Sequence, residues 1–376
     1  MHLLIAPNAF KHALDARRAA MAIAEGIREA NNNFTVTVFP VGDGGDGTGR
    51  LLTEHCRGEF ISKETIDPLG RKINAVFGLI DQGKTAVIEM AAASGLHLLG
   101  NDELAPLQAT TEGTGRQIKQ ALDHGVKKII LCVGGSATVD GGVGILRALG
   151  VRFLDKNGHS LQGIPGSLSL LDSIDKSGID QRILSTDIII LCDVKNMLLG
   201  NQGAASVFGP QKGASVEDVQ QLESGLARFT EIIRIQTGID VSQIVHGGAA
   251  GGTAAGLHAL LGAKLVNGID HFLSLTGFDQ VLGKADRVIT GEGRIDLQTL
   301  DGKAPFGVAV NAKNRSIPVT VFAGSIDTAN ESALHVVFDE LININTGPVD
   351  IATAIAATHT NLVNAAKQLV VRLSRQ

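Results

Sequence analysis

The chain has 376 residues, enough for one large α/β domain or two ordinary ones. Its 33 lysines and arginines against 38 aspartates and glutamates give a net charge of −5, so it lacks the basic surface that binding of nucleic acids or anionic membranes usually needs. Three cysteines without a C-x-x-C pair exclude a disulfide framework and a thiolate zinc site, and they predict a reducing, cytoplasmic location. We recognise neither a signal peptide nor an apolar run of the roughly 20 residues that a spanning helix needs.

The N-terminal part alternates strand and helix patterns. A strand is expected at 2–6, and Asp15 is a candidate N-cap for a helix with an apolar stripe from Ala16 to Ala30. A second strand at 34–39 leads into the glycine-rich loop VGDGGDGTG, which opens another helix. Strands that alternate with helices predict right-handed crossovers and a parallel sheet.

The middle of the chain begins with a different pattern. Three strand-like runs, at 61–66, 71–80 and 84–90, are separated by the short turn sequences DPLG and DQGK, which predicts an antiparallel meander. Mixed α and β patterns then return: a helix near 111–124, strands at 128–133 and 186–192, and a long helix that a capping box at Ser215 and Asp218 opens and that ends near Gly238.

The C-terminal part returns to the style of the N-terminal part. A strand at 286–290 precedes the expected loop GEGRIDLQTLDG, and then come a helix at 304–313, a strand at 317–322 and a long closing helix within 350–373. The fold class is therefore α/β with two domains. Residues 1–60 and 285–376 are expected to form a Rossmann-like domain with a parallel sheet of about five strands, and residues 61–284 an inserted mixed α/β domain.

One short pattern imitates a phosphate-binding loop. The octapeptide GLIDQGKT, with Lys84, fits the P-loop pattern G-x-x-x-x-G-K-[ST], but alternating β-branched residues follow it instead of a helix. The pattern therefore predicts a hairpin tip.

A second pattern imitates a dinucleotide-binding loop. Gly42, Gly44 and Gly47 fit G-x-G-x-x-G between a strand and a helix. Asp43 and Asp46 lie inside this loop and would repel a pyrophosphate unless a cation or lysine intervenes, which disfavours NAD. The remaining interpretations are a loop that offers amides and metal-directed carboxylates, and a plain tight turn with solvated aspartates.

Glycine is unusually frequent, at 46 residues, and it gathers in clusters that suggest close approach to a ligand. Small residues expose backbone N–H groups, and several clusters follow a strand or precede a helix, where oxygen ligands bind. Acidic and basic residues are embedded in them, so we interpret these clusters as more than turns. They are GGSATVDGG (134–142, with Asp140), GPQKGA (209–214, with Lys212), HGGAAGG (246–252) and TGEGRID (290–296, with Glu292 and Asp296).

Two charged residues follow predicted strands. Asp193 comes directly after the apolar run TDIIILC, where α/β proteins place groups that face a ligand, although a cap for the next turn is the alternative. Lys11 lies just beyond the first strand, and its alternative is a solvated surface lysine. The sequence has no H-E-x-x-H and no G-x-S-x-G motif. Carboxylates, lysines and anion-binding loops together are typical of phosphoryl transfer with Mg²⁺.

Nine motifs together resemble those of bacterial glycerate kinases of the first type, in the same order and over nearly the whole chain. They are APNAFK (6–11), PVGDGGDGT (40–48), DPLGR (67–71), IEMAAASGL (88–96), GGSATVDGG (134–142), CDVKN (192–196), FGPQKGA (208–214), GGAAGG (247–252) and TGEGRIDLQTLDGKAPFGVA (290–309).

The resemblance implies phosphorylation of D-glycerate by ATP with Mg²⁺, usually at the 2-hydroxyl, to give 2-phosphoglycerate and ADP. It also implies a Rossmann-like domain, an inserted domain and an active site in the cleft between them. The implied setting is cytoplasmic catabolism of glyoxylate, glucarate or related acids by a monomer or homodimer, with no nucleic-acid or membrane partner.

Roles for single residues follow from placing these motifs on that chemistry. Asp193 is the expected general base or metal-linked carboxylate, and Lys11 and Asp296 are the other expected catalytic residues. Asp43 and Glu292 are expected to bind the metal, with Asp296 helping to orient it and water. The expected glycerate-binding residues are Arg71, Lys303 and Ser136. The expected nucleotide- and phosphate-binding residues are Gly44, Gly45, Gly47, Gly134, Gly135, Thr138, Gly248, Gly251 and Gly252.

Two other functions stay open at this point. An NAD-dependent 2-hydroxy-acid oxidoreductase would use the Gly42–Gly47 loop, but the chain turns to a meander where a ribose-binding acid would be expected. A non-catalytic sensor of small acids or nucleotides is the other alternative, and the many carboxylates and lysines in the loops argue against such a passive pocket.

Overall fold

The computed structural model describes residues 1–347 and 349–375, which form two compact units. Unit 1 comprises Met1–Asp43 and Gly268–Gln376, and unit 2 comprises Gly44–Asn267. The chain thus changes unit inside the glycine-rich loop and again at Asn267, at other residues than the expected ranges 1–60, 61–284 and 285–376. The difference arises because α2 (Thr48–His55) packs on the strands of unit 2, whereas α9 (Gly268–Thr276) packs on α11 (Ala304–Lys313) in unit 1.

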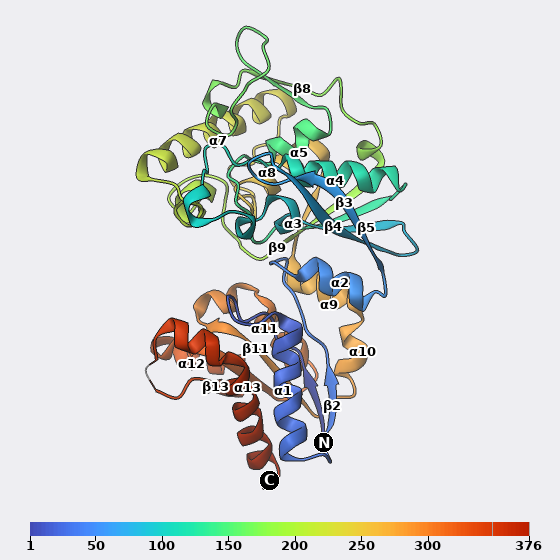
Figure 1. The fold of residues 1–376 in the computed structure, drawn as a ribbon, viewed down its shortest axis with the longest axis vertical. Coiled ribbons are helices and arrows are strands. Elements are labelled where there is room, and N and C mark those ends of the chain that lie inside the picture. The colour runs from blue at the N-terminus through green and yellow to red at the C-terminus, as the bar shows by residue number, and fades with distance from the viewer. Residues whose placement is uncertain (348, 376) are drawn as a thin grey trace. The chain divides into compact units, whose positions relative to one another are not determined.

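Unit 1 contains a five-stranded sheet in the order β13-β12-β11-β1-β2, and every neighbouring pair is parallel (Figure 1). This confirms the predicted parallel sheet. Its strands are β1 (His2–Ile5), β2 (Thr35–Val38), β11 (Arg287–Ile295), β12 (Val319–Ile326) and β13 (Glu340–Asn343).

The helices of unit 1 cover both faces of this sheet. On one face, α1 (Ala16–Ala30) and α13 (Ile351–Leu373) lie side by side over a core that includes Ile5 and Phe322 (Figure 1). Leu4 alternates to the other face and is also fully buried, so that face is covered too. The Asp15 side chain caps α1 by accepting from the Arg18 N–H, as predicted. The remaining helices of unit 1 are α10 (Phe278–Leu282) and α12 (Glu331–His335).

Unit 2 contains a six-stranded mixed sheet in the order β10-β9-β6-β5-β4-β3. Its first three strands in sequence form the predicted antiparallel meander, and the others continue parallel to β5. The strands are β3 (Glu59–Ile66), β4 (Lys72–Ile80), β5 (Thr85–Glu89), β6 (Lys128–Cys132), β9 (Asp187–Cys192) and β10 (Lys264–Asn267). A separate antiparallel pair joins β7 (Arg152–Leu154) and β8 (Ser173–Asp175).

Helices pack against this mixed sheet around one large apolar core. The helix α7 (Val216–Thr237) begins with the predicted capping box, in which each of Ser215 and Asp218 donates its backbone N–H to the side chain of the other. Its C-cap is Gly238, with φ of 76°. The helices besides α2 and α7 are α3 (Ala91–Ser94), α4 (Glu112–Asp123), α5 (Val143–Ala148), α6 (Ala204–Phe208) and α8 (Thr253–Leu261). No helix within 1–347 or 349–375 has the length and apolarity to cross a membrane.

The imitation P-loop is a hairpin. Its first glycine lies in β4, residues 81–84 form the turn, and Thr85 begins β5, which pairs antiparallel with β4. Lys84 is exposed at the tip. The predicted hairpin is confirmed, and no helix follows this lysine to present amides to a phosphate.

The segment TGEGRID departs from the expected loop. β11 continues to Ile295 because β12 extends beside it and pairs Gly291 with Phe322. Glycine permits this pairing, since a Cβ at Gly291 would lie 2.3 Å from the Phe322 carbonyl oxygen. The loop prediction was wrong for Gly291–Ile295, and Glu292 is held in a strand.

Candidate active site

Five of the expected site residues gather in unit 1, beyond or near the carboxyl ends of its strands. Lys11 follows β1, Asp43 follows β2, Glu292 lies in the second half of β11, and Asp296 and Lys303 come after it. Ligand-facing groups of open parallel sheets occupy this edge.

Asp43 is almost fully buried, and one of its carboxylate oxygens accepts two hydrogen bonds. Its Oδ2 accepts from Asn8 Nδ2 at 3.0 Å and from the Ala304 backbone N–H at 3.3 Å, at the first residue of α11. The loop after β2 is thereby fixed to the loop after β1 and to a helix N-terminus, where a negative charge is favoured.

Glu292 is buried with 8% of its surface exposed, and burial raises the pKa of its carboxyl to about 7. Lys303 and Lys11 act in the opposite direction, Asp43 raises the pKa further, and the Thr299 hydroxyl donates to Oε1 at 2.9 Å. One further carboxylate and two lysines of unit 1 therefore lie within electrostatic reach of Glu292.

This group fits a magnesium ion in part. A cluster of three or more His, Cys, Asp or Glu side chains that could hold a metal does not occur among the described residues. Mg²⁺ is usually held by only one or two carboxylates together with phosphate oxygens and water. Asp43 and Glu292 are such a pair, and a cation would favour the charged form of Glu292, whose pKa is raised mainly by burial and further by Asp43.

Asp296 has partners of its own. It caps the 3-10 turn Leu297–Asp301 by accepting from the Gln298 N–H at 3.0 Å, and its other oxygen lies 3.0 Å from the Arg294 Nε. The structure therefore shows a local role for this carboxylate, and its expected catalytic role remains a prediction.

In unit 2 the glycine clusters pack on one another beyond the ends of β6 and β9. The Gly134 N–H donates to the Gly44 carbonyl at 2.9 Å, and a Cβ at Gly134 would lie 2.4 Å from the Gly45 Cα. Gly44 itself lies against the Leu191 carbonyl of β9. Asp193, half-buried, follows the same strand. The structure thus brings the 44–47 loop, the 134–138 loop and Asp193 to one edge of the sheet.

The third glycine cluster joins them. The Gly248 N–H donates to the Asn196 carbonyl at 2.9 Å, and Gly251, with φ of +63°, approaches Thr138 so closely that a Cβ would lie 2.1 Å from its carbonyl oxygen. The Gly252 N–H also has a backbone acceptor. Several of these glycines are needed for close packing, and their role in phosphate binding remains a prediction.

The remaining expected residues of unit 2 also have protein partners. Arg71 donates to Asp67 and to Glu103, and its side chain is 46% exposed. Ser136 accepts a hydrogen bond from Lys212 Nζ at 2.9 Å. A glycerate carboxylate bound by Arg71 would share the guanidinium with these two acidic partners.

Comparison with known proteins identifies the family. The sequence matches the glycerate kinase family over residues 3–374. The chain belongs to the glycerate kinase family. A glycerate kinase of Bacillus subtilis is 43% identical over 94% of this chain and 93% of its own length, and glycerate 2-kinase of Escherichia coli is 39% identical over 100% and 98%. A crystal structure provisionally assigned as glycerate kinase 2, from Salmonella typhimurium LT2, matches all of this chain and 98% of its own with a TM-score of 0.82 and 40% identity.

The family confirms the function predicted from the sequence: the chain is an enzyme, a kinase that phosphorylates glycerate. As a kinase it uses ATP. The solved relative of the same family also supports the predicted two-domain α/β fold.

One acidic residue of the enzyme was missed by the sequence analysis. Glu89, the last residue of β5, lies against the N-terminus of α2, and its Oε1 accepts from the Gly49 N–H at 2.6 Å. The amides of Gly47 and Arg50 act on the same carboxyl. The available signal was the one used for Asp193, a carboxylate at the end of a buried strand. Phosphate binding by Gly47, which remains a prediction, would compete with Glu89 for this helix N-terminus.

The pKa of Glu89 predicts how stability depends on pH. Burial raises this pKa to about 7 in the folded state, so between pH 4.5 and 7 the folded chain holds a proton that the unfolded chain has lost. The Glu89 contribution therefore lowers stability as the pH rises through this window. Glu89→Gln does not titrate, so its stability relative to wild type is expected to improve by up to about 3 kcal/mol between pH 4.5 and 7. Urea unfolding of both proteins at pH 5 and pH 8 measures this difference, and parallel pH profiles would contradict it.

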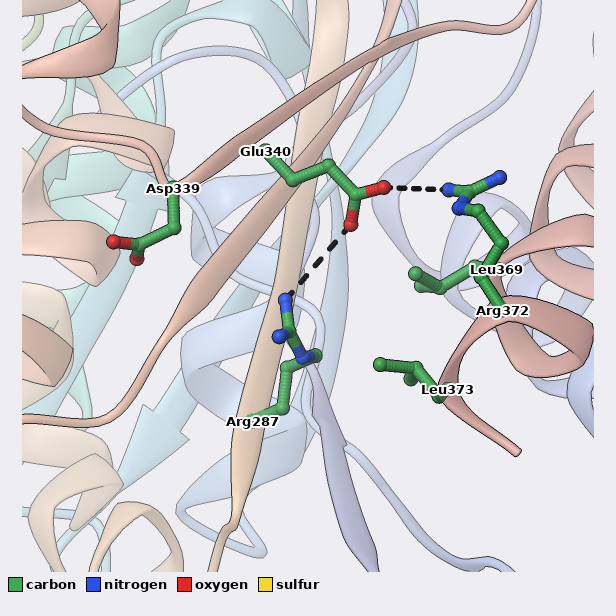
Figure 2. Close-up of a pocket in the computed structure, with 6 residues that line it drawn as sticks. All are labelled: Arg287, Asp339, Glu340, Leu369, Arg372 and Leu373. Atoms are coloured by element: carbon green, nitrogen blue, oxygen red, sulfur yellow. Dashed lines mark hydrogen bonds and ion pairs between the residues drawn. The ribbon is translucent and has the colours of Figure 1, made fainter. Parts of the chain in front are cut away.

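A pocket of about 320 Å³ lies elsewhere in unit 1 (Figure 2). Arg287 and Glu340, which line it, are the first residues of β11 and β13. The pocket therefore lies at the amino ends of these strands, whereas Glu292 and Asp43 lie toward the carboxyl ends. Glu340 pairs with Arg372 at 2.6 Å and with Arg287 at 3.9 Å. Asp339, which also lines the pocket, pairs with Lys313 at 3.4 Å. The charged side chains of the pocket thus have ion-pair partners, and the pocket has no part in the site proposed below.

Proposed function

We propose that this enzyme transfers the γ-phosphoryl group of ATP to the 2-hydroxyl of D-glycerate, giving 2-phosphoglycerate and ADP. The observation that carries the proposal is the group of two buried carboxylates and two lysines at the carboxyl edge of the unit 1 sheet, because phosphoryl transfer needs charge neutralisation more than covalent catalysis. The name of the Escherichia coli relative, glycerate 2-kinase, supports the choice of hydroxyl.

The residues divide the work as follows. Asp43 and Glu292 would hold Mg²⁺, which supplies neutralisation of the charge on the phosphate oxygens. Lys11 and Lys303 pair with anionic oxygens of the substrates. Asp193 accepts the proton as the glycerate hydroxyl oxygen bonds to the γ-phosphorus, and the bond from that phosphorus to the bridging oxygen breaks to release ADP.

The other expected residues complete the proposal. Arg71 and Ser136 orient glycerate, Asp296 orients water or the metal, and the glycine loops at 44–47, 134–138 and 247–252 contact the nucleotide phosphates. We further propose that the enzyme works in the cytoplasm as a monomer or homodimer, in the catabolism of glyoxylate, glucarate or related acids.

Product analysis tests the position of transfer. Incubation with D-glycerate and Mg·ATP is expected to give a phosphate ester whose proton-coupled phosphorus spectrum is a doublet, because the 2-position carries one hydrogen. The 3-ester carries two hydrogens on the ester carbon and gives a triplet. A triplet as the first product signal would overturn the 2-position, and no ADP formation would overturn the kinase.

Ligand-dependent thermal stability tests the nucleotide. Mg·ATP is expected to raise the melting temperature, because a ligand that binds only the native state stabilises it by RT ln(1 + [L]/Kd). NAD at the same concentration is expected to give a much smaller shift. Equal or greater protection by NAD, with no ADP formed from ATP and glycerate, would favour the oxidoreductase alternative.

A further inference from the structure

Lys212 is a buried lysine whose ammonium group contacts only neutral oxygens in hydrogen bonds. It lies in the 3-10 turn Pro210–Lys212 of the GPQKGA cluster and is 3% exposed. Its Nζ donates to Ser136 Oγ at 2.9 Å and to the Thr138 carbonyl at 2.8 Å. The ammonium has three hydrogens, so these two bonds leave capacity for one more acceptor.

A counter-ion for Lys212 is missing among the ion pairs of the described residues. Asp140, which is fully buried, is a charged group that acts on it. Asp140 is already satisfied by four donors: the Thr111 N–H and hydroxyl and the N–H groups of Gly142 and Gly144, at 2.8 to 3.1 Å. A buried charge without a paired ion destabilises the folded state. The stability of the fold therefore does not explain a lysine at this position.

The surroundings of Lys212 favour an oxygen ligand. Gly135 and Gly213, next to Ser136 and Lys212 in sequence, are exposed, so both residues of this hydrogen bond adjoin the protein surface along the chain. The Thr138 hydroxyl is buried without a hydrogen-bond partner. A ligand that offers several oxygens would satisfy both the ammonium and this hydroxyl.

We propose that Lys212 binds an anionic oxygen of a substrate, in a site that it forms with Ser136 and Thr138. The chemistry shared by the two sources is a resonance-delocalised oxyanion, either a phosphate oxygen of the nucleotide or the carboxylate of glycerate. This choice of ligands rests on the proposed function. The burial of the Lys212 ammonium within unit 2 is a structural observation that does not depend on the proposed function.

Protonation gives the site a measurable signature. Burial lowers the pKa of Lys212 to about 7, and Asp140 opposes this only in part. Above pH 7 the free enzyme therefore has a largely neutral Lys212. An anion that binds the ammonium raises this pKa, so binding at pH 8 takes up close to one proton, and the apparent Kd rises by roughly tenfold for each pH unit above 7.

Lys212→Met tests the site, since it keeps an unbranched chain and removes the charge. Loss of one charge-assisted hydrogen bond is expected to weaken the Kd of the bound ligand by roughly 10- to 100-fold and to remove its rise with pH. Lys84→Met, at the exposed hairpin tip of the same unit, is the matched control and is expected to bind as wild type does.

Separate titrations identify the oxyanion. Thermal shifts and calorimetry with Mg·ADP, D-glycerate and inorganic phosphate are compared for wild type, Lys212→Met and Lys84→Met. Weakening of Mg·ADP and phosphate alone assigns a phosphate oxygen, and weakening of D-glycerate alone assigns the carboxylate. Equal affinities in wild type and Lys212→Met for all three ligands overturn the proposal.

Wild-type calorimetry keeps the test decisive if Lys212→Met does not fold. Binding heats at pH 8 in two buffers of different ionisation enthalpy give the number of protons taken up, and a value near zero for every ligand overturns the proposal. Failure of the proposed function is seen separately, as a wild-type enzyme that binds these ligands but forms no phosphoglycerate.

Discussion

Replacing Asp193 by asparagine is expected to lower kcat by about 10²- to 10⁴-fold, the range for removal of a general base. Asp193 follows the buried strand β9, at the edge where the 44–47 and 134–138 loops meet. An asparagine has almost the same volume but cannot take the hydroxyl proton. Steady-state kinetics with saturating D-glycerate and Mg·ATP measures the loss, and the melting temperature should change little.

The other end of the same strand supplies a matched control. Asp187, the first residue of β9, is half-buried, and its side chain pairs with Lys264 at 2.9 Å. Asp187→Asn removes one carboxylate from the same unit and should leave kcat near the wild-type value. If Asp193→Asn is as active as Asp187→Asn, Asp193 only caps the turn that follows β9.

Features with a local cause were predicted well from the sequence. The N-cap at Asp15 and the capping box at Ser215 depend on residues within one helical turn. The hairpin that carries Lys84 depends on a four-residue turn between two alternating runs. The turn and strand patterns around Lys84 were stronger evidence than the match to the P-loop pattern, so the P-loop could be rejected from the sequence.

Features with a distant cause were not predictable in the same way. β11 continues through Glu292 because β12, about thirty residues later, extends beside it. A glycine-rich run has a low strand propensity, so its sequence does not predict such pairing. The unit boundaries at Asp43 and Asn267 depend on which sheet α2 and α9 pack against. Periodicity reveals that a helix has an apolar face but not which surface covers that face.

The same distinction between local and distant causes applies to the candidate site. Charged residues that follow strands were predictable, and the structure gathers Lys11, Asp43 and Glu292 as that rule indicates. The partners of individual groups were not. Glu89 reaches a helix N-terminus forty residues away, and Lys212 bonds to a loop more than seventy residues earlier. These contacts are set by tertiary packing, so the residue types could be read from the sequence but their partners could not.

Two lysine-to-alanine variants are expected to separate the proposed anion-binding region from the imitation P-loop. Lys11 acts on the buried carboxylate of Glu292 in unit 1, whereas Lys84 is exposed at the tip of the β4–β5 hairpin. Lys11→Ala should reduce kcat/KM by roughly 10- to 100-fold, equivalent to one charge-assisted hydrogen bond to a substrate. Lys84→Ala should keep kcat, KM for ATP and thermal stability nearly unchanged.

The contrast between the two variants is informative because both delete the same chemical group from an exposed position. A general effect of lost positive charge would weaken both enzymes alike, and a salt titration of kcat/KM would then reduce the difference between them and wild type. A local effect at Glu292 leaves Lys84→Ala at the wild-type value at every salt concentration. Loss of turnover in a folded Lys84→Ala, with Lys11→Ala unaffected, would move the nucleotide to the hairpin and contradict the roles proposed for the unit 1 carboxylates. The hairpin geometry argues for the opposite result, because a phosphate loop presents its lysine at the start of a helix and Lys84 instead precedes the strand β5.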